Sequence, residues 1–206
     1  MRLRRCWSWV YAGPMLILAS GSPRRRDLLD LLAVQYRVEP ADIDETPLPG
    51  ESPVEAVRRL SESKGVAVAD RFPDEWVLSA DTVVSLEGEI MGKPAGVRQA
   101  TEMLSRLSGR SHYVHTGIAL TRRGEPSRVD HSTTIVRFRH VPREDIDGYV
   151  STGEPFGKAG AYAVQGLGGM LVDRIEGELS TVVGLTLSIV VRLLSEAGIQ
   201  DLMSVR

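Results

Sequence analysis

The segment spanning residues 16–26, LILASGSPRRR, restricts the fold of this chain more than any other. Its apolar start predicts a short buried strand, and its small residues predict a tight loop. Pro23 suits the first position of a helix, and Ser22 is a good N-cap residue. A strand that passes through such a loop into a helix is typical of α/β proteins. The free N–H groups at the helix start would attract an anion, most naturally a phosphate.

The side chains around this loop favour the same interpretation. Ser20 can donate a hydroxyl hydrogen, and Gly21 lets the backbone come close to a ligand. Arg24 and Arg25 can bind phosphate oxygens through forked hydrogen-bond pairs that lysine cannot form. A capped helix whose arginines are only solvated fits this segment equally well. The segment alone therefore does not decide between an anion site and a surface helix.

Composition excludes several classes of protein. At 206 residues, 42% hydrophobic and 25% charged, the chain is an ordinary globular protein of one large domain or two small lobes that share a core. A net charge of −2 argues against broad binding to nucleic acid or acidic membranes, so any anion site is local. The single cysteine, Cys6, rules out an internal disulfide framework and fits the reducing cytoplasm.

Residues 1–14 differ from the rest of the chain, because Arg2, Arg4 and Arg5 precede a short apolar run with Trp7 and Trp9. The run is interrupted and lacks a small-residue cleavage pattern, which argues against a signal peptide. No other stretch approaches the ~20 apolar residues of a membrane span. We expect a dispensable extension at 1–14, a single two-lobed domain at 15–200 and a C-terminal tail at 201–206, without a membrane partner.

The order of the predicted elements indicates a mixed α/β sheet rather than a purely parallel one. Strands are expected at 15–19, 36–39, 76–80, 82–86, 90–91, 114–121, 129–138 and 170–175, and helices at 23–32, 53–70, 97–107, 142–150 and 184–197. Ser52 and Glu55 form a capping box for the second helix. The strand at 76–80 is expected to stop at Asp81, which would place this carboxylate at the end of a core strand, where α/β proteins gather their sites.

Lys64 falls on the apolar stripe of the second helix, seven residues after Val57 and four after Leu60. A lone lysine in such a position more often extends its charge to solvent at an edge than serves a function. The functional alternative is a cation directed into a cleft.

Asp44, Glu45 and Asp81 are the carboxylates that could accompany a phosphate site. Carboxylates repel phosphate unless Mg²⁺ or Mn²⁺ bridges them, so a divalent metal is implied. Taken singly, Asp44 and Glu45 are more simply solvated loop acids.

Lys93 and Lys158 lie in irregular segments rich in glycine and proline, which suit close approach of a ligand. The histidines lack metal-ligand spacing and are interpreted as structural or exposed; they are His112, His115, His131 and His140. No serine or cysteine has the setting of a nucleophile, so covalent catalysis has no candidate.

Six separated motifs occur in order between about residues 16 and 199. They are SGSPRR at 20–25, Lys64, ADT at 80–82, GKP at 92–94, LSGRSH at 107–112 and KAGAY at 158–162. Together they resemble the Maf family of nucleoside triphosphate pyrophosphatases, and six motifs in register are far more specific than any one of them.

The resemblance implies a fold similar to that of the inosine triphosphate pyrophosphatases, an elongated α/β molecule with a long twisted mixed sheet and two lobes around a central cleft. It also implies a homodimer in the cytoplasm that hydrolyses a nucleoside triphosphate to the monophosphate and pyrophosphate with a divalent metal, Mg²⁺ or Mn²⁺. Two alternatives remain open: a nucleotide-binding regulator of septum formation or cell division without turnover, and a nucleotidyl transferase.

The resemblance also implies roles for single residues. Asp81 corresponds to the general base, and Glu45 and Asp81 to metal ligands. The positions that contact the phosphates are Ser20, Arg24, Arg25, Lys64, Lys93 and Lys158.

Three positions, Arg24, Thr82 and Gln165, resemble those of the dTTP/UTP branch of the family. The amide of Gln165 can match the donor and acceptor edge of uracil or thymine. One departure is Gly157, where many relatives carry an acid, and we expect its absence to leave Lys158 less restrained.

Overall fold

A computed structural model describes residues 15–199, so the extension expected at 1–14 and the tail expected at 201–206 lie outside the described residues. The strands are β1 (Leu16–Leu18), β2 (Tyr36–Val38), β3 (Val77–Leu86), β4 (Glu89–Met91), β5 (Ser111–Thr121), β6 (Arg128–Phe138) and β7 (Val172–Glu176). The helices are α1 (Pro23–Asp30), α2 (Pro53–Ala69), α3 (Val97–Leu107), α4 (Arg143–Ser151), α5 (Leu179–Val183) and α6 (Leu187–Glu196), with 3₁₀ turns η1 (Ala159–Ala161) and η2 (Leu167–Leu171). None of these helices is long and apolar enough to span a membrane.

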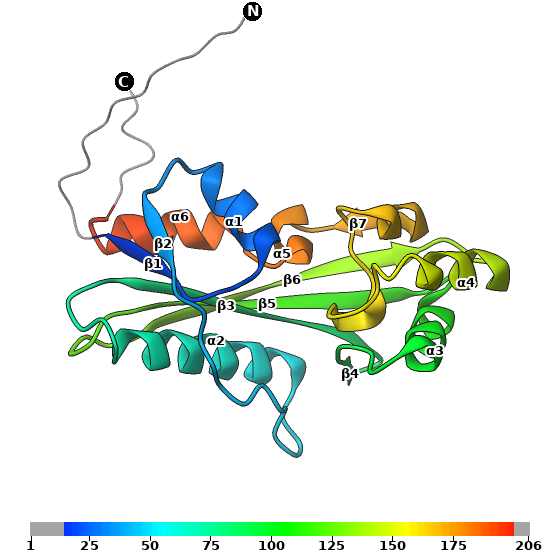
Figure 1. Cartoon of the computed structure of the whole chain (residues 1–206), viewed down its shortest axis with the longest axis horizontal. Coiled ribbons are helices and arrows are strands. Elements are labelled where there is room, and N and C mark those ends of the chain that lie inside the picture. Colours follow the sequence, from blue (N-terminus) through cyan, green and yellow to red (C-terminus); the bar gives the residue numbers. More distant parts are fainter. Residues whose placement is uncertain (1–14, 200–206) are drawn as a thin grey trace, which may run out of the picture.

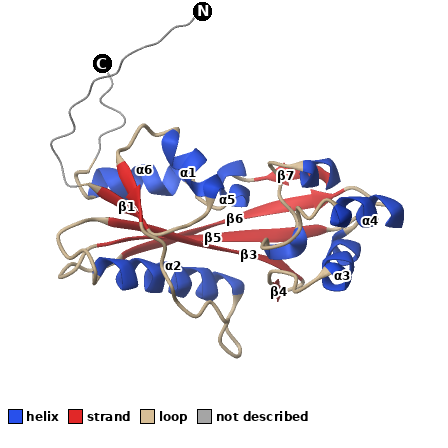
Figure 2. Cartoon of the chain, viewed as in Figure 1, coloured by secondary structure: helices blue, strands red, loops and turns tan. Residues whose placement is uncertain are grey.

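The strands form one mixed sheet in the order β2-β1-β3-β5-β6-β7, with β4 paired to β3 (Figures 1 and 2). β1 is parallel to both β2 and β3, whereas β3, β5 and β6 are long antiparallel neighbours. The expected mixed α/β fold is confirmed. Because side chains alternate along a strand, Leu78, Ala80, Thr82 and Val84 of β3 share one face, and Asp81 lies on the other.

Two apolar cores occupy the first face of the sheet. One core joins Leu78 and Ala80 to α1, α5 and α6, and the other joins Val84 to α3, α4 and η1. Thr82 falls between them and belongs to neither. The helix α2 covers the opposite face (Figure 1). The first face of the sheet thus has a break between its two cores along the middle of β3, and a third, smaller cluster packs Ile17 and Val77 against Val68 of α2.

The helix α2 lies very close to the sheet because two glycines allow it. A Cβ atom at Gly117 of β5 would lie 2.1 Å from the backbone oxygen of Val57, and one at Gly65 would lie 2.6 Å from the Thr121 hydroxyl. The expected capping box of Ser52 and Glu55 is present at the start of this helix. Close contact of helix and sheet brings α2 side chains next to β3.

Two local expectations are wrong at the site itself. β3 does not stop at Asp81 but continues to Leu86, because β5 pairs with it without interruption from Val77 to Ser85. Asp81 therefore lies mid-strand. Ser22 is the N-cap residue of α1, but its side chain makes no capping bond; its backbone N–H donates to the Ser20 hydroxyl instead.

The C-terminal segment is more divided than its apolar pattern predicts. The helix expected at 184–197 begins only at Leu187, as α6, because Gly184, whose φ is 114°, is the C-cap residue that ends a separate short helix, α5. The strand expected at 170–175 begins only at Val172, because residues up to Leu171 form the 3₁₀ turn η2.

Two buried histidines predict a pH-dependent stability. His112 and His115 are 0% and 8% exposed, and burial lowers the pKa of each from 6.5 to about 4. Between these pH values the unfolded chain binds protons that the folded chain does not. We therefore expect the free energy of unfolding to decrease as the pH falls from 6.5 towards 4, by up to about 3 kcal/mol for each histidine.

Urea denaturation of the wild type and of His115→Gln at pH 7, 5.5 and 4.5 measures this dependence. The variant is expected to lose less stability than the wild type over the same range. Equal losses in the two proteins would contradict a contribution from His115.

Candidate active site

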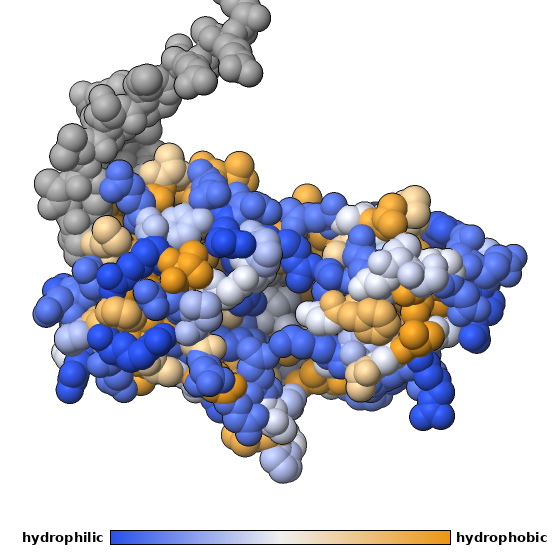
Figure 3. Space-filling model, in the orientation of Figure 1, coloured by the Kyte–Doolittle hydropathy of each residue, from blue (hydrophilic) through white to orange (hydrophobic). Residues whose placement is uncertain are grey.

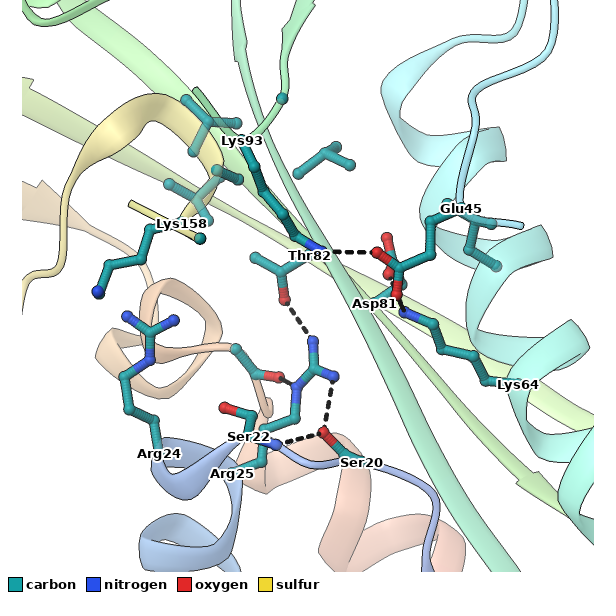
Figure 4. Close-up of a pocket in the computed structure, with 18 of the residues that line it drawn as sticks. Ser20, Ser22, Arg24, Arg25, Glu45, Lys64, Asp81, Thr82, Lys93 and Lys158 are labelled. Carbon is teal, nitrogen blue, oxygen red and sulfur yellow. Dashed lines mark hydrogen bonds and ion pairs between the residues drawn. The ribbon is translucent and has the colours of Figure 1, made fainter. Parts of the chain in front are cut away.

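A cavity of about 860 Å³ lies at the break between the two cores and is lined by residues from both faces of β3, and a hollow bordered by hydrophilic side chains is visible near the middle of the view in Figure 3. The predicted site residues that line it are Ser20, Arg24, Arg25, Glu45, Lys64, Asp81, Thr82, Lys93 and Lys158 (Figure 4). Gln165 is not among the lining residues. It is exposed and follows Val164, which does line the cavity. The fold thus brings together residues from six separate segments.

Lys64 lies between two carboxylates. Its Nζ is 2.5 Å from Oδ1 of Asp81 and 2.6 Å from Oε1 of Glu45, and Lys93 approaches the other oxygen of Glu45 at 2.7 Å (Figure 4). Lys64 and Asp81 are each 6% exposed. The ammonium group therefore does not extend to solvent; it is buried beside β3 and faces the cavity.

The loop between β2 and α2 carries Glu45 to this cluster. Burial opposes ionisation of Glu45, but the hydrogen bonds and positive charges of Lys64 and Lys93 outweigh it and lower its pKa from 4.5 to about 2. Glu45 is thus a carboxylate at neutral pH. Because the Glu45 carboxylate lies between the ammonium groups of Lys64 and Lys93, another cation can take the place of one of them.

Arg25 does not have the free guanidinium that its position in the sequence suggests. Its Nε donates to the backbone oxygen of Gly184 at 2.8 Å, and its terminal nitrogens donate to Ser20 at 3.2 Å and to Thr82 at 3.3 Å. Burial lowers its pKa, while the charges of Asp81 and Glu45 raise it. Three of its five N–H donors are used, so Arg25 is held by the protein, joins α1 to β3 and α5, and has two N–H donors left for a ligand.

Arg24 is the freer of the two arginines. It makes no hydrogen bond or ion pair with any described residue, and it lies on the same side of the cavity as Lys158 (Figure 4). Burial and the charge of Arg24 lower the pKa of Lys158. Because no carboxylate lies between Arg24 and Lys158, these two neighbouring cations attract an anion strongly.

Lys158 is more restrained than Gly157 led us to expect. Its ammonium donates to the backbone oxygen of Glu154 and, at 3.4 Å, to that of Phe156. Backbone oxygens thus hold the side chain that an acid at position 157 was expected to hold.

Glu154 and Tyr149 are positioning residues that the sequence did not reveal. The carboxylate of Glu154 accepts hydrogen bonds from the backbone N–H groups of Leu167 and Gly168 and from the Tyr149 hydroxyl, which itself accepts from Ala163 N–H. These bonds anchor both ends of the segment that contains Gln165. The one signal of this anchoring in the sequence is the run of small residues around Gln165, which leaves backbone N–H groups accessible to the Glu154 carboxylate.

Comparison with known proteins agrees with the motifs. The model of the Maf family, described as Maf-like protein, matches residues 15–197. A dTTP/UTP pyrophosphatase of Myxococcus xanthus is 50% identical over 185 residues, which cover 90% of this chain and 93% of the relative. A dTTP/UTP pyrophosphatase of Symbiobacterium thermophilum is 48% identical over 183 residues, with 89% and 94% covered.

Among solved structures, a Ham1 protein from Coxiella burnetii gives a TM-score of 0.46 at 20% identity and covers 63% of this chain and 75% of its own. The family match and the identity to the relatives extend over nearly all the described residues and include every motif that contributes to the cavity. This chain therefore belongs to the Maf-like protein family.

Proposed function

We propose that this protein hydrolyses nucleoside triphosphates, with dTTP and UTP as its substrates, to the nucleoside monophosphate and pyrophosphate. The relatives that are about half identical to it are named dTTP/UTP pyrophosphatases. The observation that carries the proposal is the convergence of cations around two carboxylates, the buried Asp81 and the exposed Glu45. The cations Arg24, Arg25, Lys64, Lys93 and Lys158 and the acids Asp44, Glu45 and Asp81 all line one cavity.

The excess of cations suits a triphosphate tail, and the cavity volume is in the range of small-molecule sites. Arg24 and Lys158 have donors directed at no carboxylate, so they are the groups best able to bind phosphate oxygens. The nucleoside would then extend towards Thr82 and the segment that carries Gln165. The amide of Gln165 can pair with the imide edge of uracil or thymine.

Asp81 and Glu45 would hold the divalent metal, Mg²⁺ or Mn²⁺. Both carboxylates bind one cationic group, the Lys64 ammonium, so their oxygens converge on a single point. The described residues contain no cluster of three or more potential ligands, so substrate and water oxygens must supply the rest, as is usual for Mg²⁺. When bound, the metal would supply Lewis acidity at a phosphate oxygen and lower the pKa of a nearby water.

In this proposal Asp81 acts as the general base. Its Oδ1 is bound to Lys64, which leaves Oδ2 to accept a proton from the water that attacks the α-phosphorus. The bond from this phosphorus to the oxygen that bridges to the β-phosphate then breaks, and pyrophosphate leaves with that oxygen. Arg24 and Lys158 stabilise the negative charge that grows on the leaving group.

Incubation of the protein with each nucleoside triphosphate and Mg²⁺, followed by chromatography of the products, tests the proposal. We expect pyrophosphate and the monophosphate from dTTP and UTP, and loss of both products in EDTA. Release of inorganic phosphate and a diphosphate would contradict the reaction. Binding of nucleotides without turnover would favour a regulator instead.

The homodimer and the cytoplasmic location also remain predictions. Light scattering of the purified protein and fractionation of cells that express it would test them.

A further inference from the structure

A row of hydroxyl groups crosses the sheet at the break between the two cores. Thr82 on β3, Thr116 on β5 and Ser132 on β6 are direct cross-strand neighbours. On either side the same face is apolar, with Ala80 and Ile118 in one core and Val84 and Val114 in the other. Thr116 is 0% exposed and does not line the cavity, whereas Thr82 does. The row therefore leads from the cavity wall into the interior.

The hydrogen bonds of this row have only one possible direction. Oγ1 of Thr116 lies 2.8 Å from the backbone oxygen of Thr181. Because a carbonyl oxygen can only accept, the Thr116 hydroxyl donates its single hydrogen to Thr181. The contact of 2.9 Å between the hydroxyls of Thr116 and Thr82 must then use the hydrogen of Thr82. Thr82 also accepts from Arg25, at 3.3 Å. The chain runs from Arg25 through Thr82 and Thr116 to the carbonyl of Thr181.

We propose that Thr116 is a positioning residue that fixes the Thr82 hydroxyl as an acceptor towards the cavity, so that Thr82 selects a hydrogen-bond donor on the nucleoside part of the substrate. With its hydrogen committed to Thr116, Thr82 has only a lone pair left for a ligand. Ionised phosphate oxygens also only accept, so Thr82 does not bind the triphosphate.

This inference rests on the proposed function and specifies how the site recognises the base or the sugar of its substrate. Uracil and thymine carry an N–H at ring position 3, where cytosine carries a lone pair. The sugar hydroxyls are the other donors of the uracil and thymine nucleosides, whereas cytosine also carries an amino group at ring position 4. Either the ring N–H or a sugar hydroxyl satisfies Thr82, and a buried site that offers an acceptor discriminates strongly against a partner that cannot donate.

The test replaces Thr116 with valine, which has nearly the same shape but cannot accept the hydrogen of Thr82. The Thr82 hydroxyl is then free to turn and donate to the ligand. Thr116→Ser keeps the hydroxyl and serves as the rescue. Thr121→Val is the matched control, because Thr121 is a buried threonine of the same strand that does not line the cavity and whose hydroxyl donates to the backbone oxygen of Val77 at 3.4 Å.

The readout is the ratio of kcat/KM between UTP and CTP, and between UTP and its 2′- and 3′-deoxy analogues, for each variant. We expect one of these ratios to fall at least about tenfold in Thr116→Val, and to be retained in Thr116→Ser and Thr121→Val. A change in the UTP to CTP ratio assigns the donor to the base, and a change with the deoxy analogues assigns it to the ribose.

Unchanged kcat/KM ratios in a folded Thr116→Val that still hydrolyses UTP would overturn the inference about Thr116 but not the proposed function. A wild type that releases no pyrophosphate from any nucleotide would overturn the proposed function. If Thr116→Val fails to fold, Thr82→Val and Thr82→Ser give the same comparison at the cavity wall. A kcat/KM ratio that is lost in Thr82→Val and retained in Thr82→Ser supports the acceptor role of Thr82. Equal ratios in the two variants refute it.

Discussion

Replacement of Asp81 with asparagine is expected to lower kcat for pyrophosphate release about a thousandfold. Asparagine has the shape of aspartate but cannot take a proton from the attacking water. The fold should persist, because Lys64 keeps Glu45 as a partner at 2.6 Å and is not left as an unpaired buried charge. Thermal denaturation and product analysis on the same preparation separate loss of chemistry from loss of structure.

Asp173→Asn is the control for this variant, because Asp173 is an exposed carboxylate of β7 that pairs with Arg137 and does not line the cavity. It is expected to retain wild-type kcat. An Asp81→Asn enzyme with more than about a tenth of the wild-type rate would remove Asp81 from the proton transfer, since general bases typically contribute 10²- to 10⁴-fold.

Replacement of Gly117 with alanine is expected to lower the free energy of unfolding by about 3 kcal/mol, the upper part of the range for overpacked interiors. The new Cβ would lie 2.1 Å from the backbone oxygen of Val57 and 2.5 Å from its carbonyl carbon. Backbone atoms of a helix cannot move aside as a side chain can, so the whole of α2 must shift. That shift would also displace Lys64 from Asp81, so activity should fall with stability.

Gly148→Ala is the matched control. Gly148 lies in α4 with nothing within 4 Å of a Cβ atom, so alanine there is expected to be neutral or to stabilise by up to about 1 kcal/mol. Chemical denaturation of both variants measures the difference between a glycine that is required and one that is not. Equal midpoints would show that α2 can move away from the sheet at little cost.

Local pattern was sufficient for most elements of this fold and for some of the site. The capping box at Ser52 and the apolar stripe of α2 predicted the start of that helix and the face on which Lys64 lies, because these features depend on residues within a few turns. The favoured interpretation, in which the Lys64 charge extends to solvent, was wrong, because its ammonium is buried between Asp81 and Glu45. Local pattern was not sufficient where distant segments decide the outcome. The predicted end of a strand at Asp81 was wrong, because pairing with β5 carries β3 through a polar residue that alone predicts an interruption.

The arginines show the same limit at the level of side chains. Arg24 and Arg25 look alike in the sequence, yet Arg25 is bound to Gly184, which is 159 positions away, and Arg24 is not engaged in this way. No local pattern carries that distinction. The orientation of the Thr82 hydroxyl likewise depends on Thr116 and Thr181, which only the folded sheet brings together.

The sequence by itself determined which elements form, which faces are buried and which residues could carry charge into a cleft, because helix caps, apolar periodicity and glycine turns act over a few residues. Only the tertiary structure decided that two cores leave a break at Thr82, that Lys64 lies between Asp81 and Glu45, and which hydrogen-bond donors remain free. These features depend on partners tens of residues apart, which become neighbours only when the sheet and its helices pack.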